Sequence, residues 1–341
     1  VFLALLVPAM QEDACPGGQC SGHDAHPGGM GVLSGGRAGG NVEMVSVVTP
    51  TRGKTRDWHP LLYACFKQQD YEPKELVVVD DAAEASPFFA ALQDPAVRYI
   101  LLNHSVPLGA KRNLLAQEAR GAILAHFDDD DWYAPAYLSS MVAELRRTQA
   151  SVVKLSGWFV YSCKLKFFGY FDPGETAVFG EVKSQGLDEG LKYSLFLDPR
   201  DPIVQTWVMG PSGAYDAQLR DETRYGFGFT YVYRRELAIE MEYNHSQTFG
   251  EDLQWIVRVQ NAGVKVAHFA DRAGLTLHVQ GHWNTARIPT QYKIPAFLVP
   301  RVLGQLAVNY TRCAPSEDLA VGAAAAKPKK KKGSKTSKKK K

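Results

Sequence analysis

Four consecutive aspartates, Asp128 to Asp131, are the side chains whose type and spacing point most directly to chemistry. Adjacent carboxylates repel one another, so gathering them costs free energy unless a cation offsets their charge. Mg²⁺ and Mn²⁺ prefer carboxylate oxygens and commonly bridge them to substrate phosphates. The run therefore predicts a divalent-metal site. The alternative is a solvated acidic loop, or a helix start capped by Asp131.

Two other acidic pairs stand beside predicted elements. Asp80 and Asp81 end the β-branched run ELVVVDD, and Glu251 and Asp252 open the helical pattern GEDLQWIVRVQNAG. Acids are favourable at a helix N-terminus for electrostatic reasons alone, and an aspartate often caps a turn. Each pair therefore has a structural interpretation as well as a functional one.

Strand and helix patterns alternate through the first half of the chain. Short β-branched runs predict buried parallel strands, and apolar residues three and four apart predict helices. This alternation predicts an α/β fold with a parallel sheet wound by helices, whose ligands collect at the carboxyl ends of the strands. Asp80–Asp81 and the four-aspartate run both lie at such ends. The predicted strands are 45–49, 75–81, 97–102 and 121–127, and the predicted helices are 57–69 and 110–119.

The second half of the chain differs from the first in its residue pattern and its aromatic content. Residues 151–235 are less regular and rich in aromatic side chains, which predicts strands and long loops. Residues 250–263 predict a helix that ends at Gly263. We therefore expect one half at 42–150, which holds the acidic strand ends, and a second half at 151–313.

The two ends of the chain are expected to be disordered. Residues 1–41 join an apolar stretch, too short to span a bilayer, to a Gly-rich linker, and residues 314–341 form an Ala- and Lys-rich tail. The apolar stretch is either a stray terminus or the remnant of a signal or anchor, and we expect the secretory pathway rather than the cytoplasm. The five cysteines are scattered, which argues against a zinc site or a dense disulfide framework, although Cys15 and Cys20 can pair in an oxidising compartment.

The lysine tail accounts for the positive charge of the chain. The net charge is +3, and the ten lysines of 327–341 leave −7 on the remainder. A negatively charged body argues against specific nucleic-acid binding by the folded part. Weak contact of the tail with an anionic membrane or another polyanion remains open, as does a purely solubilising tail.

Five segments, taken in order, resemble the family 2 glycosyltransferases over about residues 43–283. They are VSVVTPTRGK, ELVVVDD, GAKRN, ILAHFDDDDWYAPAYL and GEDLQWIVRVQNAG. The resemblance implies a GT-A fold: a mostly parallel sheet flanked by helices, with a mixed acceptor-binding half. It implies metal-dependent, inverting transfer of a sugar from a nucleotide diphosphate donor, usually UDP, to a glycan, lipid or protein hydroxyl. The processive synthases of the family carry a Gln-x-x-Arg-Trp motif and membrane spans, and their absence here implies transfer of single sugars.

The resemblance also implies which residues bind the donor. The loop after the first strand wraps the nucleotide, the acid that ends the second strand hydrogen-bonds the base, and the GAKRN segment approaches the nucleotide and diphosphate. A helix cap at Asp81 and an ordinary cationic helix face in GAKRN are the alternatives. The implied nucleotide-sugar-binding residues are Pro50, Thr51, Arg52, Asp81, Lys111, Arg112, Asn113, Asp128 and Asp129.

Metal and proton chemistry fall to three further sites. Asp130 is implied as the direct ligand of Mn²⁺ or Mg²⁺, with Asp128 or Asp129 on the ribose or in the outer shell of the metal. A histidine near the end of the domain often completes such a site, and His282 is preferred to His278. Asp252 matches the catalytic base, and Glu251 beside it is expected to orient the acceptor.

Two other classes of protein remain as alternatives. A nucleotidyltransferase acting on sugar phosphates would also use a wound sheet and metal-binding acids, but TPTRGK is poor in the glycine expected of a triphosphate loop. A catalytically inactive polyanion-binding protein would rely on the lysine tail. The presence of Asp128, Asp130 and Asp252 argues against an inactive protein.

Overall fold

The computed structural model describes residues 42–171, 225–284 and 292–313. The expectations for the N-terminal linker, the Cys15–Cys20 pair and the lysine tail lie outside the described residues. The part that carries the predicted chemistry belongs to the compact unit that begins at Val42.

Four parallel strands form the first half of the sheet, as predicted. They lie in the order β3-β2-β1-β4, and every pair in this order is parallel. The side chains of β1, β2 and β4 are almost all buried on both faces, which is why these segments read as mostly apolar runs, whereas β3 at the edge is partly exposed. The strands are β1 Val45–Thr51, β2 Lys74–Asp80, β3 Val97–Leu101 and β4 Ile123–His126.

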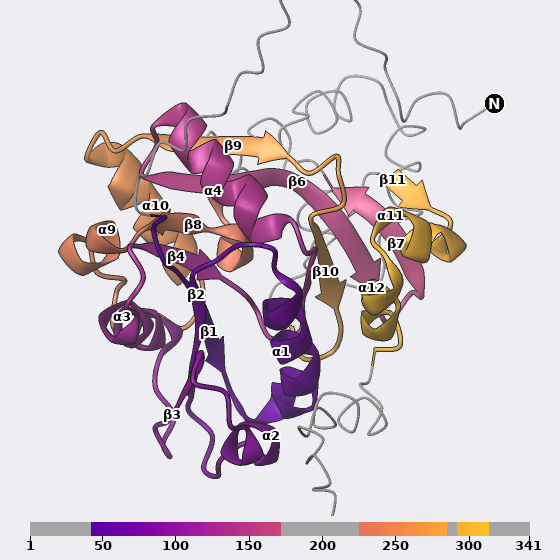
Figure 1. Ribbon diagram of the computed structural model, residues 1–341, viewed down its shortest axis with the longest axis horizontal. Coiled ribbons are helices and arrows are strands. Elements are labelled where there is room, and N and C mark those ends of the chain that lie inside the picture. The colour runs from indigo at the N-terminus through magenta and orange to yellow at the C-terminus, as the bar shows by residue number, and fades with distance from the viewer. Residues whose placement is uncertain (1–41, 172–224, 285–291, 314–341) are drawn as a thin grey trace, which may run out of the picture. The chain divides into compact units, whose positions relative to one another are not determined.

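Helices cover both faces of these strands (Figure 1). Val47 and Leu76 pack into one core with α1 and α4, whereas Val48 and Val77 pack into a second core with α3 and α10. The helices predicted at 57–69, 110–119 and 250–263 are confirmed within about two residues. The helices of the described part up to α10 are α1 His59–Gln68, α2 Pro87–Ala91, α3 Leu108–Glu118, α4 Tyr137–Thr148, α9 Arg235–Glu240 and α10 Glu251–Asn261.

The long strand β6, Val152–Ser162, joins the first half of the sheet to the second. It pairs antiparallel with β8 and β7 and parallel with β9 and β10, so the second half is mixed, as expected. β8 in turn pairs with β4, so one continuous sheet carries both halves. The remaining strands are β5 Trp132–Tyr133, β7 Phe167–Phe171, β8 Val232–Arg234, β9 Val266–Ala270, β10 Thr276–Gln280 and β11 Tyr292–Ile294.

The last described segment is fastened back onto the sheet. It holds η4 Ala296–Leu298, α11 Val299–Val302 and α12 Gln305–Tyr310, drawn in yellow in Figure 1. A disulfide joins Cys313 after α12 to Cys163 after β6, across 150 residues of sequence. No helix among the described residues is both long and apolar enough to cross a membrane.

Candidate active site

A cavity of about 360 Å³ opens at the carboxyl ends of β1, β2 and β4, where the wound sheet predicts ligand binding. All but one of the predicted nucleotide-sugar-binding residues line it, and Asn113 is the exception. Thr248, Trp283 and Asn284 of the second half also line it. The predicted residues in the lining are Pro50, Thr51, Arg52, Asp81, Lys111, Arg112, Asp128, Asp129 and Asp130.

Asp81 and Lys111 form one wall of this cavity. The Lys111 ammonium donates to Asp81 Oδ1 at 3.1 Å and to the carbonyl of Thr51 at 3.0 Å, and it is only 5% exposed. Burial lowers the pKa of Lys111, and the Asp81 charge opposes that shift. The Val106 amide and the Ser105 hydroxyl donate to Asp81 Oδ2 at 3.2 and 3.3 Å. The carboxylate is thereby held at the cavity wall.

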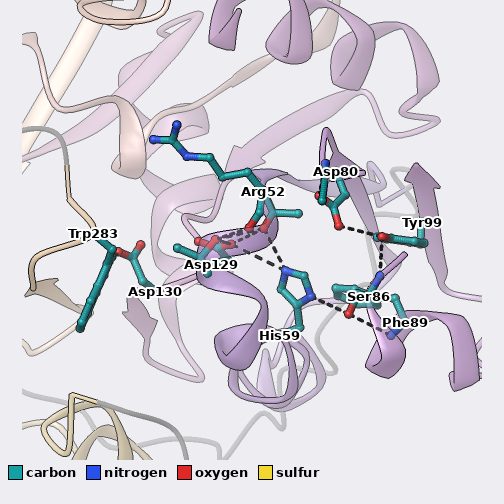
Figure 2. Close-up of polar contacts among 12 residues, drawn as sticks. Arg52, His59, Asp80, Ser86, Phe89, Tyr99, Asp129, Asp130 and Trp283 are labelled. Carbon is teal, nitrogen blue, oxygen red and sulfur yellow. Dashed lines mark hydrogen bonds and ion pairs between the residues drawn. The ribbon is translucent and has the colours of Figure 1, made fainter. Parts of the chain in front are cut away.

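Asp129 is held by the first strand and the turn after it. Its Oδ2 accepts hydrogen bonds from the Thr51 hydroxyl and, at 2.6 Å, from the Thr55 hydroxyl. His59 Nε2 lies 2.9 Å from Thr51 Oγ1 and 3.7 Å from Asp129 Oδ2. Figure 2 shows His59 facing this acid from α1. These contacts direct Asp129 toward β1.

The hydrogen bonds continue from His59 away from the cavity (Figure 2). His59 Nδ1 lies 2.8 Å from Ser86 Oγ, the hydroxyl that caps α2. The Ser86 amide donates to the Tyr99 hydroxyl at 2.9 Å, and that hydroxyl donates to Asp80 Oδ2 at 2.7 Å. The network ties the acid run to the end of β2, next to Asp81. His59, Ser86 and Tyr99 had no signal in the sequence.

Asp130 is held from the second half of the chain. Its Oδ2 accepts from the indole of Trp283 at 2.6 Å and from the Asn284 amide at 3.1 Å. Figure 2 shows the Trp283 ring beside this carboxylate. The Trp283 ring packs at a tilt against Trp58, with ring centroids 5.4 Å apart. Trp58 in turn stacks on Tyr310 of α12, with ring centroids 5.6 Å apart.

Asp131 has a different role from its three neighbours. It is fully buried and is absent from the cavity lining. Its two oxygens face His278 Nδ1 and the Val279 amide, both at 2.8 Å. The structure therefore brings His278 to the acid run through Asp131. The preferred histidine, His282, is exposed and contacts the Trp283 ring.

The acid run fits a hard divalent cation. Carboxylate oxygens of Asp128, Asp130 and Asp131 lie within 4.8 Å of one another. Burial, together with the neighbouring aspartates, raises the pKa of Asp128 to about 7 and the pKa of Asp130 well above its usual value. A cation among these oxygens would offset the repulsion that raises both values. Of the three, Asp128 and Asp130 line the cavity and are the candidate ligands.

Arg112 connects the cavity to α10, the base helix, which carries the predicted catalytic base Asp252. Its Nε donates to Glu251 Oε1 at 2.9 Å, and the two side chains are 5% and 4% exposed. Burial raises the pKa of Glu251, and Arg112 opposes that shift. Arg112 Nη1 also lies 2.9 Å from Nδ1 of the buried His126, whose pKa is lowered by burial and by Arg112. The arginine expected to approach phosphate is therefore also the buried partner of Glu251.

Asn113 points away from the cavity, to the segment that leads into the base helix. Its amide donates to the Tyr243 carbonyl at 2.8 Å, and its side-chain oxygen accepts from the Tyr243 amide at 2.7 Å. One turn earlier, Gly109 donates to the Gln247 carbonyl, and a Cβ on Gly109 would lie 2.1 Å from the Asn244 carbonyl oxygen. The first turns of α3 thus dock the 243–247 segment.

Asp252 is the second residue of α10 and is half-buried. Its Oδ2 accepts the Gly228 amide at 2.6 Å. Its neighbour Glu251 is held by Arg112, which lines the cavity. Neither Asp252 nor Glu251 is among the residues that line the cavity, and the Arg112–Glu251 pair is what connects their helix to it.

The comparisons with known proteins place the chain in a family. The model of glycosyl transferase family 2 matches residues 46–241, and the chain belongs to this family. The succinoglycan biosynthesis protein ExoO of Rhizobium meliloti (strain 1021) is 38% identical over 92 residues, which are 24% of this chain and 26% of that protein.

Solved structures of S. aureus TarS 1–349 are also similar. One is 17% identical with a TM-score of 0.43, over 69% of this chain and 60% of that one. The complex of the same protein with UDP-GlcNAc is 16% identical with a TM-score of 0.45, over 72% and 62%. The chain thus spans about a quarter of the curated relative and about three fifths of these solved chains.

Proposed function

We propose that this chain is a divalent-metal-dependent, inverting glycosyltransferase that uses a nucleotide diphosphate sugar, with UDP as the expected nucleotide. The observation that carries the proposal is one cavity lined by Asp81, Lys111, Asp128 and Asp130, which the Arg112–Glu251 pair connects to α10, the helix of Asp252. Family membership supports the same chemistry. The acceptor is a hydroxyl of a glycan, lipid or protein, and single sugars are transferred.

The residues divide the reaction between them. Asp81 accepts a hydrogen bond from the nucleobase of the donor, and Lys111 contributes positive charge to the same wall of the cavity. A divalent cation held by Asp128 and Asp130 would neutralise the charge that grows on the leaving diphosphate. Asp252 takes the proton of the acceptor hydroxyl while that oxygen bonds to the anomeric carbon and the bond to the diphosphate breaks. Attack from the face opposite the diphosphate inverts the anomeric centre.

We also propose that the protein works in an oxidising compartment of the secretory pathway. The Cys163–Cys313 disulfide supports this location, because cytosolic thiols are kept reduced. Mass spectrometry of protein alkylated before reduction tests it: both cysteines are expected to be protected in protein taken from its native source. Free Cys163 and Cys313 in that sample would contradict the proposed location.

Turnover is tested with UDP-glucose, UDP-galactose and UDP-GlcNAc, each with Mn²⁺, Mg²⁺ or chelator, by measuring released UDP. We expect release with at least one donor, dependent on the metal. NMR of the product formed with an accepted sugar should show the inverted anomeric configuration. No metal-dependent UDP release from any nucleotide sugar would contradict the enzyme proposal, and a retained configuration would contradict inversion alone.

A further inference from the structure

The turn at Gly226–Gly228 lies between the predicted base and β6, and buried side chains contact the carbonyl groups of both of its glycines. The Lys154 ammonium donates to the Gly226 carbonyl at 2.6 Å. Nδ1 of His126 lies 2.8 Å from the Gly228 carbonyl oxygen. Both partners are buried in strands of the sheet, with Lys154 in β6 and His126 in β4. The turn therefore rests on rigid elements.

The amide side of the same turn faces Asp252. The Gly228 N–H donates to Asp252 Oδ2 at 2.6 Å, and a Cβ on Gly228 would lie 2.8 Å from Asp252 Cβ and 3.1 Å from Oδ2. A methyl group at Gly228 would therefore displace the carboxylate or the turn. The hydrogen bond to the amide and the close approach of the turn together define where the Asp252 carboxylate lies.

Lys154 is an unusual residue to find in this place. It is fully buried in the middle of a strand, with its ammonium 5.7 Å from the Trp158 ring centroid and 5.8 Å from that of Tyr231. Burial lowers the pKa of Lys154 to about 7, and the charge of Asp252 opposes the shift. An apolar residue would fill a strand interior at lower cost, since burying a charge is expensive. Two of the groups near the Lys154 ammonium, the Gly226 carbonyl and the charge of Asp252, belong to the predicted base and the turn beside it.

We propose that Lys154 is a positioning residue for the catalytic base. Through the Gly226–Gly228 turn it holds the Asp252 carboxylate in the orientation in which that carboxylate can take the proton of the acceptor hydroxyl. This inference rests on the proposed function, because it needs Asp252 to act as the base. It assigns a role to the Gly-Phe-Gly sequence, which is too short to identify a phosphate loop. Because Lys154 does not line the cavity, the inference predicts that changing Lys154 affects proton transfer and leaves donor binding unchanged.

The test compares Lys154→Met with wild type in Mn²⁺-dependent release of UDP from the accepted UDP-sugar. Methionine fills a similar volume without the donor and the charge. We expect kcat to fall about 10–100-fold, the scale on which misplaced catalytic groups reduce rate, with the donor KM within about twofold of wild type. Lys265→Met removes an exposed lysine just before β9 and is the matched control, expected to match wild type.

A double-variant cycle separates positioning from a general loss of structure. In the Asp252→Asn background, adding Lys154→Met should change the residual rate by less than about twofold, because groups that act through one another are not additive. Gly228→Ala is the second route to the same result, and it should lower kcat without raising the donor KM even if Lys154→Met folds poorly.

The outcomes distinguish this inference from the proposed function. An active wild type with a fully active Lys154→Met would overturn the positioning role alone. The same holds if Lys154→Met lowers the residual rate of Asp252→Asn by the full factor, or if it raises only the donor KM. A wild-type chain that releases no UDP under any condition would instead overturn the proposed function.

Discussion

Replacing Arg112 with methionine should destabilise the protein strongly, because it leaves the Glu251 carboxylate buried without its partner. The guanidinium and carboxylate are 2.9 Å apart and 5% and 4% exposed, so water screens them little. Removing one member of a buried ion pair costs about 3–5 kcal/mol. At about 2–4 °C per kcal/mol for a domain of this size, the Tm should fall by roughly 6–20 °C.

The loss should also depend on pH, with a sign fixed by the Glu251 pKa. Burial raises that pKa, and Arg112 opposes the shift. Without Arg112 the folded-state pKa rises further, so the folded protein keeps a proton that the unfolded chain has released. A group with a raised folded-state pKa favours folding below its unfolded pKa and loses that contribution as pH rises. The variant should therefore lose more stability at pH 8 than at pH 5.

Thermal and urea unfolding of wild type and Arg112→Met at pH 5 and pH 8 measure both effects. Arg147→Met is the matched control, because Arg147 pairs with Glu144 on the surface with 72% of its side chain exposed. An exposed pair contributes little, so the control should unfold like wild type. If Arg112→Met unfolds like the control, or loses the same stability at both pH values, the buried pair does not hold the base helix as described.

Three other predictions concern the disulfide and the acid run. The Cys163→Ser, Cys313→Ser double variant should lose up to about 5 kcal/mol, the chain-entropy value for a loop of this length, and unfolding scans should match wild type once the wild type is reduced. His59→Phe keeps an aromatic ring in place but loses the contacts of the imidazole with Thr51 and Asp129, so calorimetry should show Mn²⁺ affinity about tenfold weaker. Unchanged affinity would contradict the idea that His59 supports the acid run. Because the pKa of Asp128 is raised to about 7, Mn²⁺ binding should release a proton and strengthen from pH 6 to pH 8, and equal affinity at both would contradict that shift.

The first half of the fold could be predicted from the sequence because the burial of its strands is recorded in local runs of residues. Strands buried on both faces need apolar side chains on both faces, so β1, β2 and β4 appear as mostly apolar runs, and the partly exposed edge strand β3 keeps the apolar residues Val97, Ile100 and Leu101. The acids at their carboxyl ends then fall together by topology alone. This reasoning correctly placed Asp81, Asp128, Asp129 and Asp130 around one cavity.

The second half was harder to read because its contacts join distant residues. Arg112 meets Glu251 across 139 positions, and Asp130 meets Trp283 across 153. Composition and periodicity do not reveal such pairs, because many cations and hydrogen-bond donors in the sequence could equally pair with these acids. The family motif indicated only that GAKRN approaches the nucleotide, so the docking of the 243–247 segment by Asn113 was missed.

The sequence analysis expected strands and long loops over 151–235, but it predicted neither the length of β6 nor the Cys163–Cys313 disulfide. Lys154 and Ser156 interrupt an otherwise apolar run, so Val152–Ser162 reads as irregular although every residue in it is buried. Cys163 and Cys313 are one pair among several that five scattered cysteines allow, and only the fold brings them together.

The central claim is that donor recognition and proton removal belong to separate carboxylates, with Asp130 after β4 and Asp252 on α10. Calorimetric titration of UDP in the presence of Mn²⁺ into Asp130→Asn and Asp252→Asn, beside wild type, tests it most directly. We predict that Asp252→Asn binds UDP within about twofold of wild type, and that Asp130→Asn loses the Mn²⁺-dependent part of binding. Metal-dependent binding that survives in Asp130→Asn, or is lost in Asp252→Asn, would contradict the claim.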